Sequence, residues 1–269
     1  MLNQIMARKR EELVERSCEV TLEELEDRFL ESPPASLEAV LVRPGVNIIA
    51  EIKYSSPSHG PFKCRLAPED VAQIYVENGA AALSILTDEP FFGGSLEYLD
   101  RVFQHLIREE RNSDSGERTP LLRKDFILDR FQVAEAKVYG ASAFLLIVAC
   151  LDSVQLRSLI EYGREIGLEA LVEIHDPFEL DVALDSGARI LGVNNRNLKT
   201  FEVDINTSFA IARRLEGEDR FVLVAESGVS HRSEILELKD AGFHGFLIGT
   251  AFMESDDPGA KLRELTHGE

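Results

Sequence analysis

Residues 47–60 read NIIAEIKYSSPSHG, an apolar run that ends in ionic residues and then breaks into a turn-rich segment. This pattern predicts a buried strand that delivers polar side chains to a loop. Because successive side chains of a strand point to opposite faces, Glu51 and Lys53 should share one face with Ile49. A neighbouring carboxylate and ammonium can be a structural ion pair or a working pair, and this stretch alone leaves both readings open.

The rest of the chain repeats a pattern of short apolar run, loop and amphipathic helix, with a period of roughly 20–40 residues that is typical of parallel strands joined by helical crossovers. Eight such strands predict a closed (β/α)8 TIM barrel. An open doubly wound sheet is the alternative, but no glycine-rich dinucleotide fingerprint follows the first strand. The seven later runs are 82–86, 121–124, 143–148, 170–174, 190–194, 221–226 and 245–249.

Helices are expected before the first strand. Residues 2–18 carry apolar positions at helical spacing, with the basic run Arg8–Arg10 on the solvated side. Thr21 begins a second helix with a capping box that ends at Glu24. We therefore expect one barrel domain over residues 1–269, in which residues 1–45 form a helical extension packed on the barrel.

Composition excludes several classes of function. The net charge of −19 argues against nucleic-acid binding, because no surplus of Lys and Arg is available to neutralise phosphates. No apolar run approaches the roughly 18 residues of a membrane span, and the N-terminus lacks the apolar core of a secretion signal, so a cytoplasmic protein is expected. The three Cys are far apart and should be reduced thiols, while the six His show no metal-ligand spacing.

Polar residues stand where the apolar runs end. The C-terminal ends of barrel strands form the catalytic face of this fold, so these side chains should converge on one mouth. Each alone could be a rim ion pair, but several ionisable groups in a confined site are costly unless they are used. The candidate catalytic residues are Glu51, Lys53, Lys124, Glu173, Asn194 and Glu226.

The last two strands lead into loops of small residues. Ser227 and Gly228 follow the seventh strand, and Gly249 and Thr250 follow the eighth. Backbone N–H groups are exposed in such loops, which are where barrels of this kind commonly hold phosphate. The alternative is that each glycine only permits a tight turn. Their joint position favours a phosphorylated small-molecule substrate.

These residues lie in motifs that resemble indole-3-glycerol phosphate synthase of tryptophan biosynthesis. The resemblance covers nearly the whole chain, and its motifs are specific in combination. They are Ala50–Lys53 with Ser56–Ser58, Leu86–Asp88, Phe91–Ser95, Arg123–Phe126, Leu171–His175, Gly192–Leu198, Ala225–Gly228 and Ile248–Thr250.

The resemblance implies a reaction and assigns roles. The family closes the ring of 1-(2-carboxyphenylamino)-1-deoxyribulose 5-phosphate, releases carbon dioxide and water, and forms indole-3-glycerol phosphate without a cofactor or metal. Lys124 would be the acid of ring closure. Glu173, with Glu51 and Lys53, would carry the later proton transfers, and the division among these three stays open.

The resemblance also implies how the substrate is held. Asn194 and Arg196 would steer it, Ser56 would lie near its carboxylate, and Glu226 and Ser227 would border the polar centre and the phosphate loop. Phe92 and Phe126 would form a wall against the aromatic ring.

A monomer is compatible with the sequence, other tryptophan-pathway enzymes stay open as partners, and neither nucleic acid nor membrane is expected.

Two other functions compete with this one. The first is another phosphate-binding barrel enzyme, such as phosphoribosylanthranilate isomerase. That family relies on a Cys and Asp pair, whereas the first strand here ends in Glu51 and Lys53. The second is a catalytically silent barrel that serves as a scaffold, against which the intact set of Glu51, Lys53, Lys124 and Glu173 argues.

Overall fold

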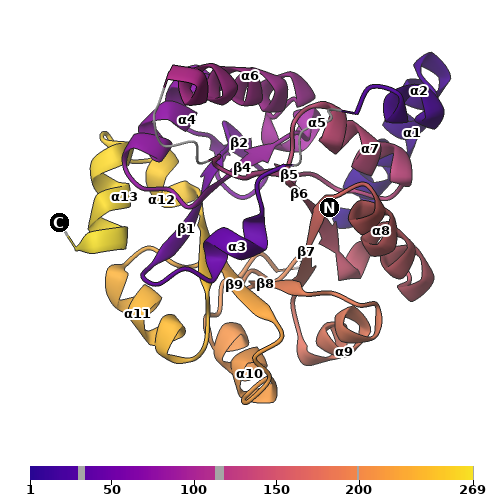
Figure 1. Cartoon of the computed structure of the whole chain (residues 1–269). Coiled ribbons are helices and arrows are strands. Elements are labelled where there is room, and N and C mark those ends of the chain that lie inside the picture. The colour runs from indigo at the N-terminus through magenta and orange to yellow at the C-terminus, as the bar shows by residue number, and fades with distance from the viewer. Residues whose placement is uncertain (30–33, 113–117, 199, 269) are drawn as a thin grey trace.

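The strands form a closed parallel barrel surrounded by helices (Figure 1). The computed structural model describes residues 1–29, 34–112, 118–198 and 200–268. The predicted (β/α)8 fold is confirmed, and the seven later runs match their strands to within one residue at either end. The barrel strands are β1 (Asn47–Ile52), β4 (Ala82–Leu86), β5 (Leu121–Lys124), β6 (Ala143–Ile147), β7 (Glu169–Ile174), β8 (Ile190–Asn194), β9 (Val222–Glu226) and β10 (Gly245–Ile248).

The barrel closes between its first and last strands. Strand β1 pairs with β10 through Asn47 and Gly245, and on its other side with β4 through Ile49 and Ala82. The order around the barrel is β1-β10-β9-β8-β7-β6-β5-β4, so every strand has a neighbour on both sides. Because all strands are parallel, all of their C-terminal ends meet at one mouth.

Capping residues mark the ends of several crossover helices. Asp152 and Asp176 accept hydrogen bonds from the first backbone N–H groups of α8 and α9, and Gly140 and Gly167 follow α7 and α8 with positive φ. The main helices are α4 (Pro68–Glu77), α6 (Leu96–Asn112), α7 (Arg130–Val138), α8 (Ser153–Glu165), α9 (Pro177–Asp185), α10 (Asn206–Arg214), α11 (Arg232–Asp240) and α13 (Pro258–His267). The short elements are α5 (Glu89–Phe92), α12 (Thr250–Met253), a 3-10 turn (Val148–Cys150), β2 (Ser55–Ser56) and β3 (Gly60–Pro61).

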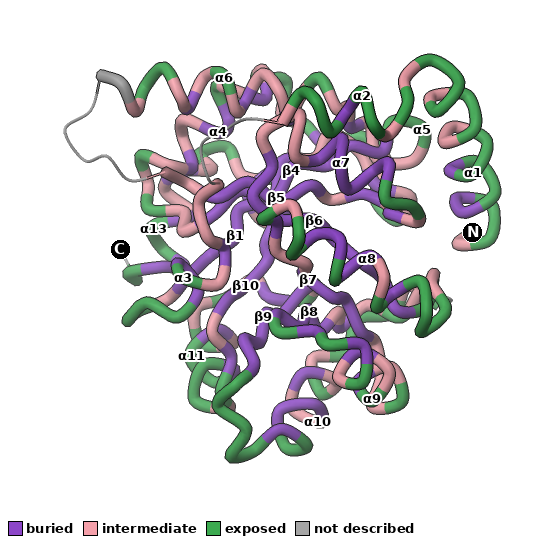
Figure 2. Tube along the Cα trace, turned by 45° about the vertical axis from the view of Figure 1, so that its right-hand side comes forward, coloured by how far each residue is buried: buried purple, intermediate pink, exposed green. Residues whose placement is uncertain are grey.

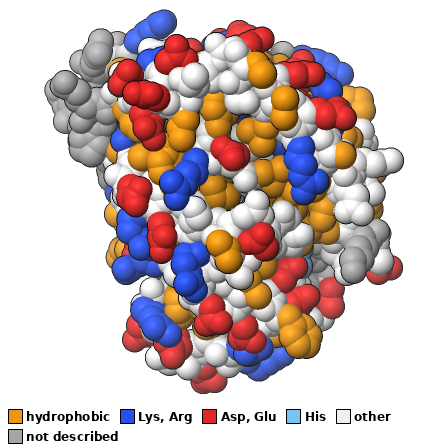
Figure 3. Space-filling model, turned by 90° about the vertical axis from the view of Figure 1, so that its right-hand side faces the viewer, with side chains coloured by type: hydrophobic (Ala, Val, Ile, Leu, Met, Phe, Trp, Pro, Cys, Tyr) orange, Lys and Arg blue, Asp and Glu red, His pale blue; other side chains and the backbone are white. Residues whose placement is uncertain are grey.

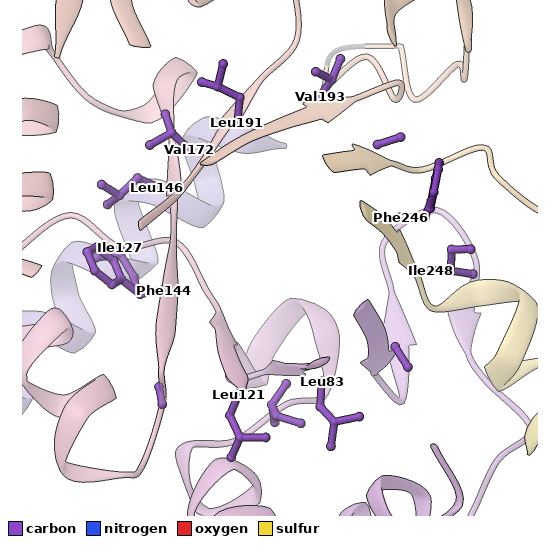
Figure 4. Packing of buried hydrophobic residues seen from close by; sticks show 14 of the residues in the cluster. Leu83, Leu121, Ile127, Phe144, Leu146, Val172, Leu191, Val193, Phe246 and Ile248 are labelled. Carbon is purple, nitrogen blue, oxygen red and sulfur yellow. The ribbon is translucent and has the colours of Figure 1, made fainter. Parts of the chain in front are cut away.

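Side-chain alternation along the strands divides the core into two layers. Ile49 belongs to the cluster inside the barrel, whereas Ile48, Ala50 and Ile52 belong to the larger cluster between strands and helices. Figure 4 shows outer-layer side chains on several strands, and Figure 2 shows that the buried residues gather along the strands. The inward face of β1 is therefore the face that Glu51 shares with Ile49.

Helix α3 (Leu37–Leu41) closes one end of the barrel, and no sequence pattern predicts this short element. Its Leu37, Val40 and Leu41 join the cluster inside the barrel, and α3 lies over the middle of the ring in Figure 1. The side chain of Asn47, at the start of β1, donates a hydrogen bond of 2.7 Å to the backbone oxygen of Leu41. The N-terminal end of the barrel is thus filled.

The N-terminal helices α1 (Leu2–Glu19) and α2 (Leu22–Glu26) lie at the edge of the ring, where α2 packs on α7. Thr21 forms the predicted capping box with Glu24. The prediction that the whole basic run of α1 is solvated is wrong for Lys9, of which only 2% is exposed. Lys9 follows Ile5 by four residues, so it lies on the buried face of the helix.

The surface carries charges of both signs. Acidic and basic side chains are interspersed over the face drawn in Figure 3. Within the described ranges, no helix is both long enough and apolar enough to cross a membrane. Cys18, Cys64 and Cys150 are all free thiols, as the sequence predicts.

Candidate active site

A cavity of about 720 Å³ opens at the C-terminal ends of the strands. Its size suits a small organic ligand. Every residue that the sequence singled out for catalysis, substrate binding or phosphate binding lines this cavity: Glu51, Lys53, Ser56, Phe92, Lys124, Phe126, Glu173, Asn194, Arg196, Glu226, Ser227, Gly228, Gly249 and Thr250.

Lys124, at the end of β5, is held between two carboxylates. Its Nζ donates a hydrogen bond of 3.0 Å to Glu173 Oε2, and a second one to Glu226 Oε2. Burial opposes the charge of Lys124, but the carboxylates of Glu173, Glu226 and Glu51 outweigh this effect and raise the pKa of Lys124. The ammonium therefore stays protonated and fixed in direction.

The two carboxylates that share Lys124 differ in their surroundings. Burial disfavours the charge of Glu173, yet Lys124, His175 and Asn194 together lower its pKa. Burial raises the pKa of Glu226 to about 8, because attraction to Lys124 is partly offset by repulsion from Glu173. Two carboxyl groups whose pKa values are pushed apart in this way can divide acid and base work.

Glu51 and Lys53 form a second ion pair in the same cavity. Lys53 Nζ lies 2.7 Å from Glu51 Oε1 and 5.6 Å from the centre of the Phe62 ring. Glu51 packs against the backbone of Gly249, where an added Cβ would lie 2.5 Å from Glu51 Oε1. The glycine at 249 thus makes room for the Glu51 carboxylate, a reason that differs from both sequence interpretations of this residue.

Asn194 and Arg196 connect β8 to the candidate catalytic groups. The Asn194 side-chain nitrogen donates to Glu173 Oε1 at 3.1 Å, and its oxygen accepts from the backbone N–H of Arg196 at 3.0 Å. The Arg196 guanidinium donates to the backbone oxygen of Phe201 at 3.1 Å. Asn194 therefore fixes one oxygen of Glu173 while Lys124 holds the other.

The loop after β9 has an unusual backbone conformation at the cavity. Ser227 has φ of 60° and Gly228 has φ of 80°. A non-glycine residue in the left-handed region is strained, and such residues cluster at functional sites. Asn195 stabilises this turn by donating a hydrogen bond of 3.1 Å to the backbone oxygen of Ser227. Thr250, the first residue of α12, also lines the cavity.

Two aromatic rings form an apolar wall. Phe92 lies at the end of α5, and Phe126 follows β5 two residues after Lys124. Their ring centroids are 6.0 Å apart with an angle of 40° between the planes. Ser56 on β2 lines the cavity as well. The site thus combines an apolar wall with a cluster of charges, as small-molecule sites commonly do.

Sequence reasoning missed several groups that border the site. Met1, together with Leu2 and Ile5 of α1, lines the cavity, although no sequence pattern at the N-terminus predicts this contribution. His175 was quoted only as part of a motif, yet its Nε2 lies 3.1 Å from Glu173 Oε1 and its Nδ1 lies 3.0 Å from Glu179 Oε2. The available sequence signal is that His175 follows Glu173 by two residues. In an extended chain this spacing puts both side chains on the same face.

Comparisons with known proteins agree with this geometry. Among solved structures, a 3-hexulose-6-phosphate synthase superposes with a TM-score of 0.61 at 15% identity, covering 82% of this chain and 98% of that one, which shows the shared fold alone. The indole-3-glycerol phosphate synthase of Koribacter versatilis is 43% identical over 267 residues, which cover 98% of each chain. That of Carboxydothermus hydrogenoformans is 45% identical over 236 residues, covering 86% of this chain and 85% of the relative. The family model described as Indole-3-glycerol phosphate synthase matches residues 2–265, so the chain belongs to the indole-3-glycerol phosphate synthase family.

Proposed function

We propose that this cavity converts 1-(2-carboxyphenylamino)-1-deoxyribulose 5-phosphate into indole-3-glycerol phosphate, carbon dioxide and water, the decarboxylating lyase step of tryptophan biosynthesis. One observation carries the proposal. The cavity holds two separate ammonium–carboxylate systems, Lys124 with Glu173 and Lys53 with Glu51. The reaction has two stages that need proton transfer, ring closure and dehydration, and each system can serve one of them.

Ring closure is assigned to Lys124. The aromatic carbon that bears the carboxylate attacks the ketone carbon of the sugar chain, and the ketone oxygen takes a proton from the Lys124 ammonium. Loss of carbon dioxide then returns an electron pair to the ring and restores its aromaticity. Glu226, whose pKa is raised to about 8 by burial, hydrogen-bonds to Lys124 and can return a proton to it.

Dehydration is assigned to Lys53 and Glu51. The new hydroxyl group leaves as water after Lys53 protonates it, and Glu51 takes the proton from the adjacent carbon so that the double bond of the indole forms. The two groups lie 2.7 Å apart, so the proton can pass back from Glu51 to Lys53. In this scheme Glu173 remains ionised and holds Lys124 in place during the first stage, because its pKa is lowered by Lys124 and His175.

The remaining groups bind and orient the substrate. Phe92 and Phe126 would hold the aromatic ring, while Arg196 and Ser56 would face its carboxylate. The loops at Gly228 and Thr250 would hold the phosphate with backbone N–H groups. These assignments place the reacting carbons between the aromatic wall and the two charge systems, and proximity of this kind accounts for a large share of enzymatic acceleration.

We also propose that the chain acts in the cytoplasm as a monomer that does not bind nucleic acid. The net charge of −19 opposes contact with the phosphate backbones of nucleic acids. Light scattering of the purified protein would report its mass in solution. A mass of twice 30.0 kDa at working concentration would replace the monomer with a dimer.

The deciding experiment is an assay of the purified protein with the carboxyphenylamino sugar phosphate and no added metal. Formation of indole-3-glycerol phosphate should be seen in the ultraviolet spectrum through absorption by its indole ring. One carbon dioxide should be released for each molecule of this product. The same preparation should be tested with phosphoribosylanthranilate. Isomerisation of that compound without indole formation would replace the synthase by the isomerase alternative, and inactivity on both would favour a silent barrel.

A further inference from the structure

We propose that Lys9 of the N-terminal helix is a positioning residue, which fixes the spacing of Phe92 and Phe126 by bridging the carboxylates of Asp88 and Asp125. This inference rests on the proposed function, in which the two phenylalanines hold the aromatic ring of the substrate. Lys9 itself does not line the cavity, so its effect is transmitted through the two aspartates.

The bridge consists of three buried groups. Lys9 Nζ lies 3.0 Å from Asp88 Oδ2 and 2.9 Å from Asp125 Oδ1. The side chains are 3%, 1% and 1% exposed, respectively. Buried charges are retained only when they are paired, and burial strengthens their attraction. Here one ammonium joins an aspartate that follows β4 to an aspartate that follows β5.

Asp88 connects the bridge to Phe92. Its other side-chain oxygen accepts a hydrogen bond of 2.9 Å from the backbone N–H of Phe91, and so caps helix α5. Its backbone oxygen accepts from the N–H of Gly94 at 2.8 Å, which closes the same short turn. Phe92 lies between these two contacts. The orientation of Asp88 therefore sets where the Phe92 ring enters the cavity.

Asp125 connects the bridge to Phe126 in the same way. Its Oδ1, the atom that faces Lys9, also accepts a hydrogen bond of 2.8 Å from the backbone N–H of Phe126. Its Oδ2 accepts from Thr87 at 2.6 Å and from Arg123 at 3.0 Å. Thr87 and Arg123 thus hold the Asp125 carboxylate in place on the barrel. Lys9 contacts both aspartates, so it holds Asp88 at a set distance from Asp125.

A second pairing keeps α1 seated on the barrel. Arg16, two turns after Lys9, pairs with Glu135 of α7, and Glu135 pairs with Arg123 at 3.2 Å. Arg123 in turn holds Asp125. Lys9, Asp125, Arg123, Glu135 and Arg16 therefore form a chain of ion pairs with alternating charge, and both ends of this chain belong to α1. These ion pairs hold the helix on the barrel, and within this chain of ion pairs Lys9 is the member that contacts both Asp88 and Asp125.

The test uses a variant that removes the bridge without leaving an unpaired charge. Lys9→Met alone would leave Asp88 buried without its cation, whereas Lys9→Met with Asp88→Asn leaves no such charge and keeps a residue that caps helices well. We expect the double variant to fold and to raise KM by about tenfold, with kcat and inhibition by inorganic phosphate changed less than about threefold. Arg10→Gln, on the exposed side of α1, is the matched control and should leave both constants at the wild-type values.

The outcomes separate positioning from simple charge balance. A double variant with wild-type KM would show that Lys9 only neutralises Asp88, and would overturn the inference. A crystal structure of the double variant gives a readout that does not depend on activity. The distance between the Phe92 and Phe126 ring centroids, 6.0 Å in the wild type, should change by about 1 Å or more. An unchanged distance would also overturn the inference. If the wild-type protein formed no indole-3-glycerol phosphate, that result would count against the proposed function. The ring positions in the crystal structure of the double variant would still decide whether Lys9 positions Phe92 and Phe126.

Discussion

Lys124 on β5 and Glu173 on β7 meet across the width of β6, with 3.0 Å between the ammonium nitrogen and the carboxylate oxygen. In the proposed mechanism, this contact holds the acid of the first reaction stage in a single direction. It also makes the two residues dependent on each other, because removal of either would leave the other charge buried.

Lys124→Met should reduce kcat by at least about a hundredfold, the usual scale for the loss of a positioned acid. The variant should fold, although without the ammonium the pKa values of Glu173 and Glu226 will rise. Lys239→Met, on the exposed side of α11, is the matched control. Steady-state kinetics with circular dichroism will check the prediction, and activity within a few-fold of wild type would remove Lys124 from the acid role.

Glu51→Gln and Lys53→Met should each lose most activity with modest changes in melting temperature. If the pair were purely structural, loss of one partner would cost about 3–5 kcal/mol of stability, and replacement of both by apolar residues could restore fold and activity together. We expect the double variant to stay inactive however stable it becomes. Thermal unfolding and turnover should be measured on all three variants, and recovery in the double variant would assign the pair to stability alone.

Inorganic phosphate should compete with substrate if the loops after β9 and β10 hold the phosphate group. Gly228→Val is a poor probe, since a Cβ there would collide with Val203 before it reached a ligand. Thr250→Val removes only a hydroxyl group at nearly constant shape, and should raise KM and the inhibition constant of phosphate by the same factor, about five- to tenfold. Non-competitive inhibition by phosphate would place its site elsewhere.

His175 should make stability depend on pH. Its carboxylate neighbours Glu173 and Glu179 raise its pKa from 6.5 to about 10 against the effect of burial. A raised pKa means that the folded state binds the proton more tightly, so this contribution is complete below pH 6.5 and declines as pH rises towards 10. The difference in melting temperature between wild type and His175→Gln should shrink over the same window.

The same substitution should alter the pH profile of the reaction. His175 helps to lower the pKa of Glu173, so its loss should move the acidic limb of kcat/KM to higher pH. His105→Gln on α6, outside the cavity lining, is the control. An acidic limb that stays in place would show that Lys124 and Asn194 alone keep Glu173 ionised.

The sequence predicts the barrel well because most strands are short apolar runs, and several of these runs carry a polar residue at or near their C-terminal end. Glu51, Lys124, Glu173 and Glu226 could be found together for the same reason, since parallel strands must bring their ends to one mouth. Helix α3 could not be predicted in this way, because five residues are too few to show a helical period.

Lys9 was missed for a different reason. Hydropathy treats a lysine beside two arginines as solvated, and only its spacing of four residues from Ile5 indicated the buried face. The purpose of Gly249 was also hidden, because the carboxylate that needs its missing Cβ belongs to β1, at the other end of the chain. Both depend on contacts between distant segments, which local patterns do not report.

The seam between β1 and β10 has a consequence for biosynthesis. Asn47 on β1 pairs with Gly245, the first residue of β10. The ribosome must therefore release nearly the whole chain before the barrel can close. Until then, β1 presents an unpaired edge to the cell, and long-range pairing of this kind is slow. Nascent chains that stop before β10 are therefore expected to need chaperones or to aggregate, even though they already carry all six candidate catalytic residues.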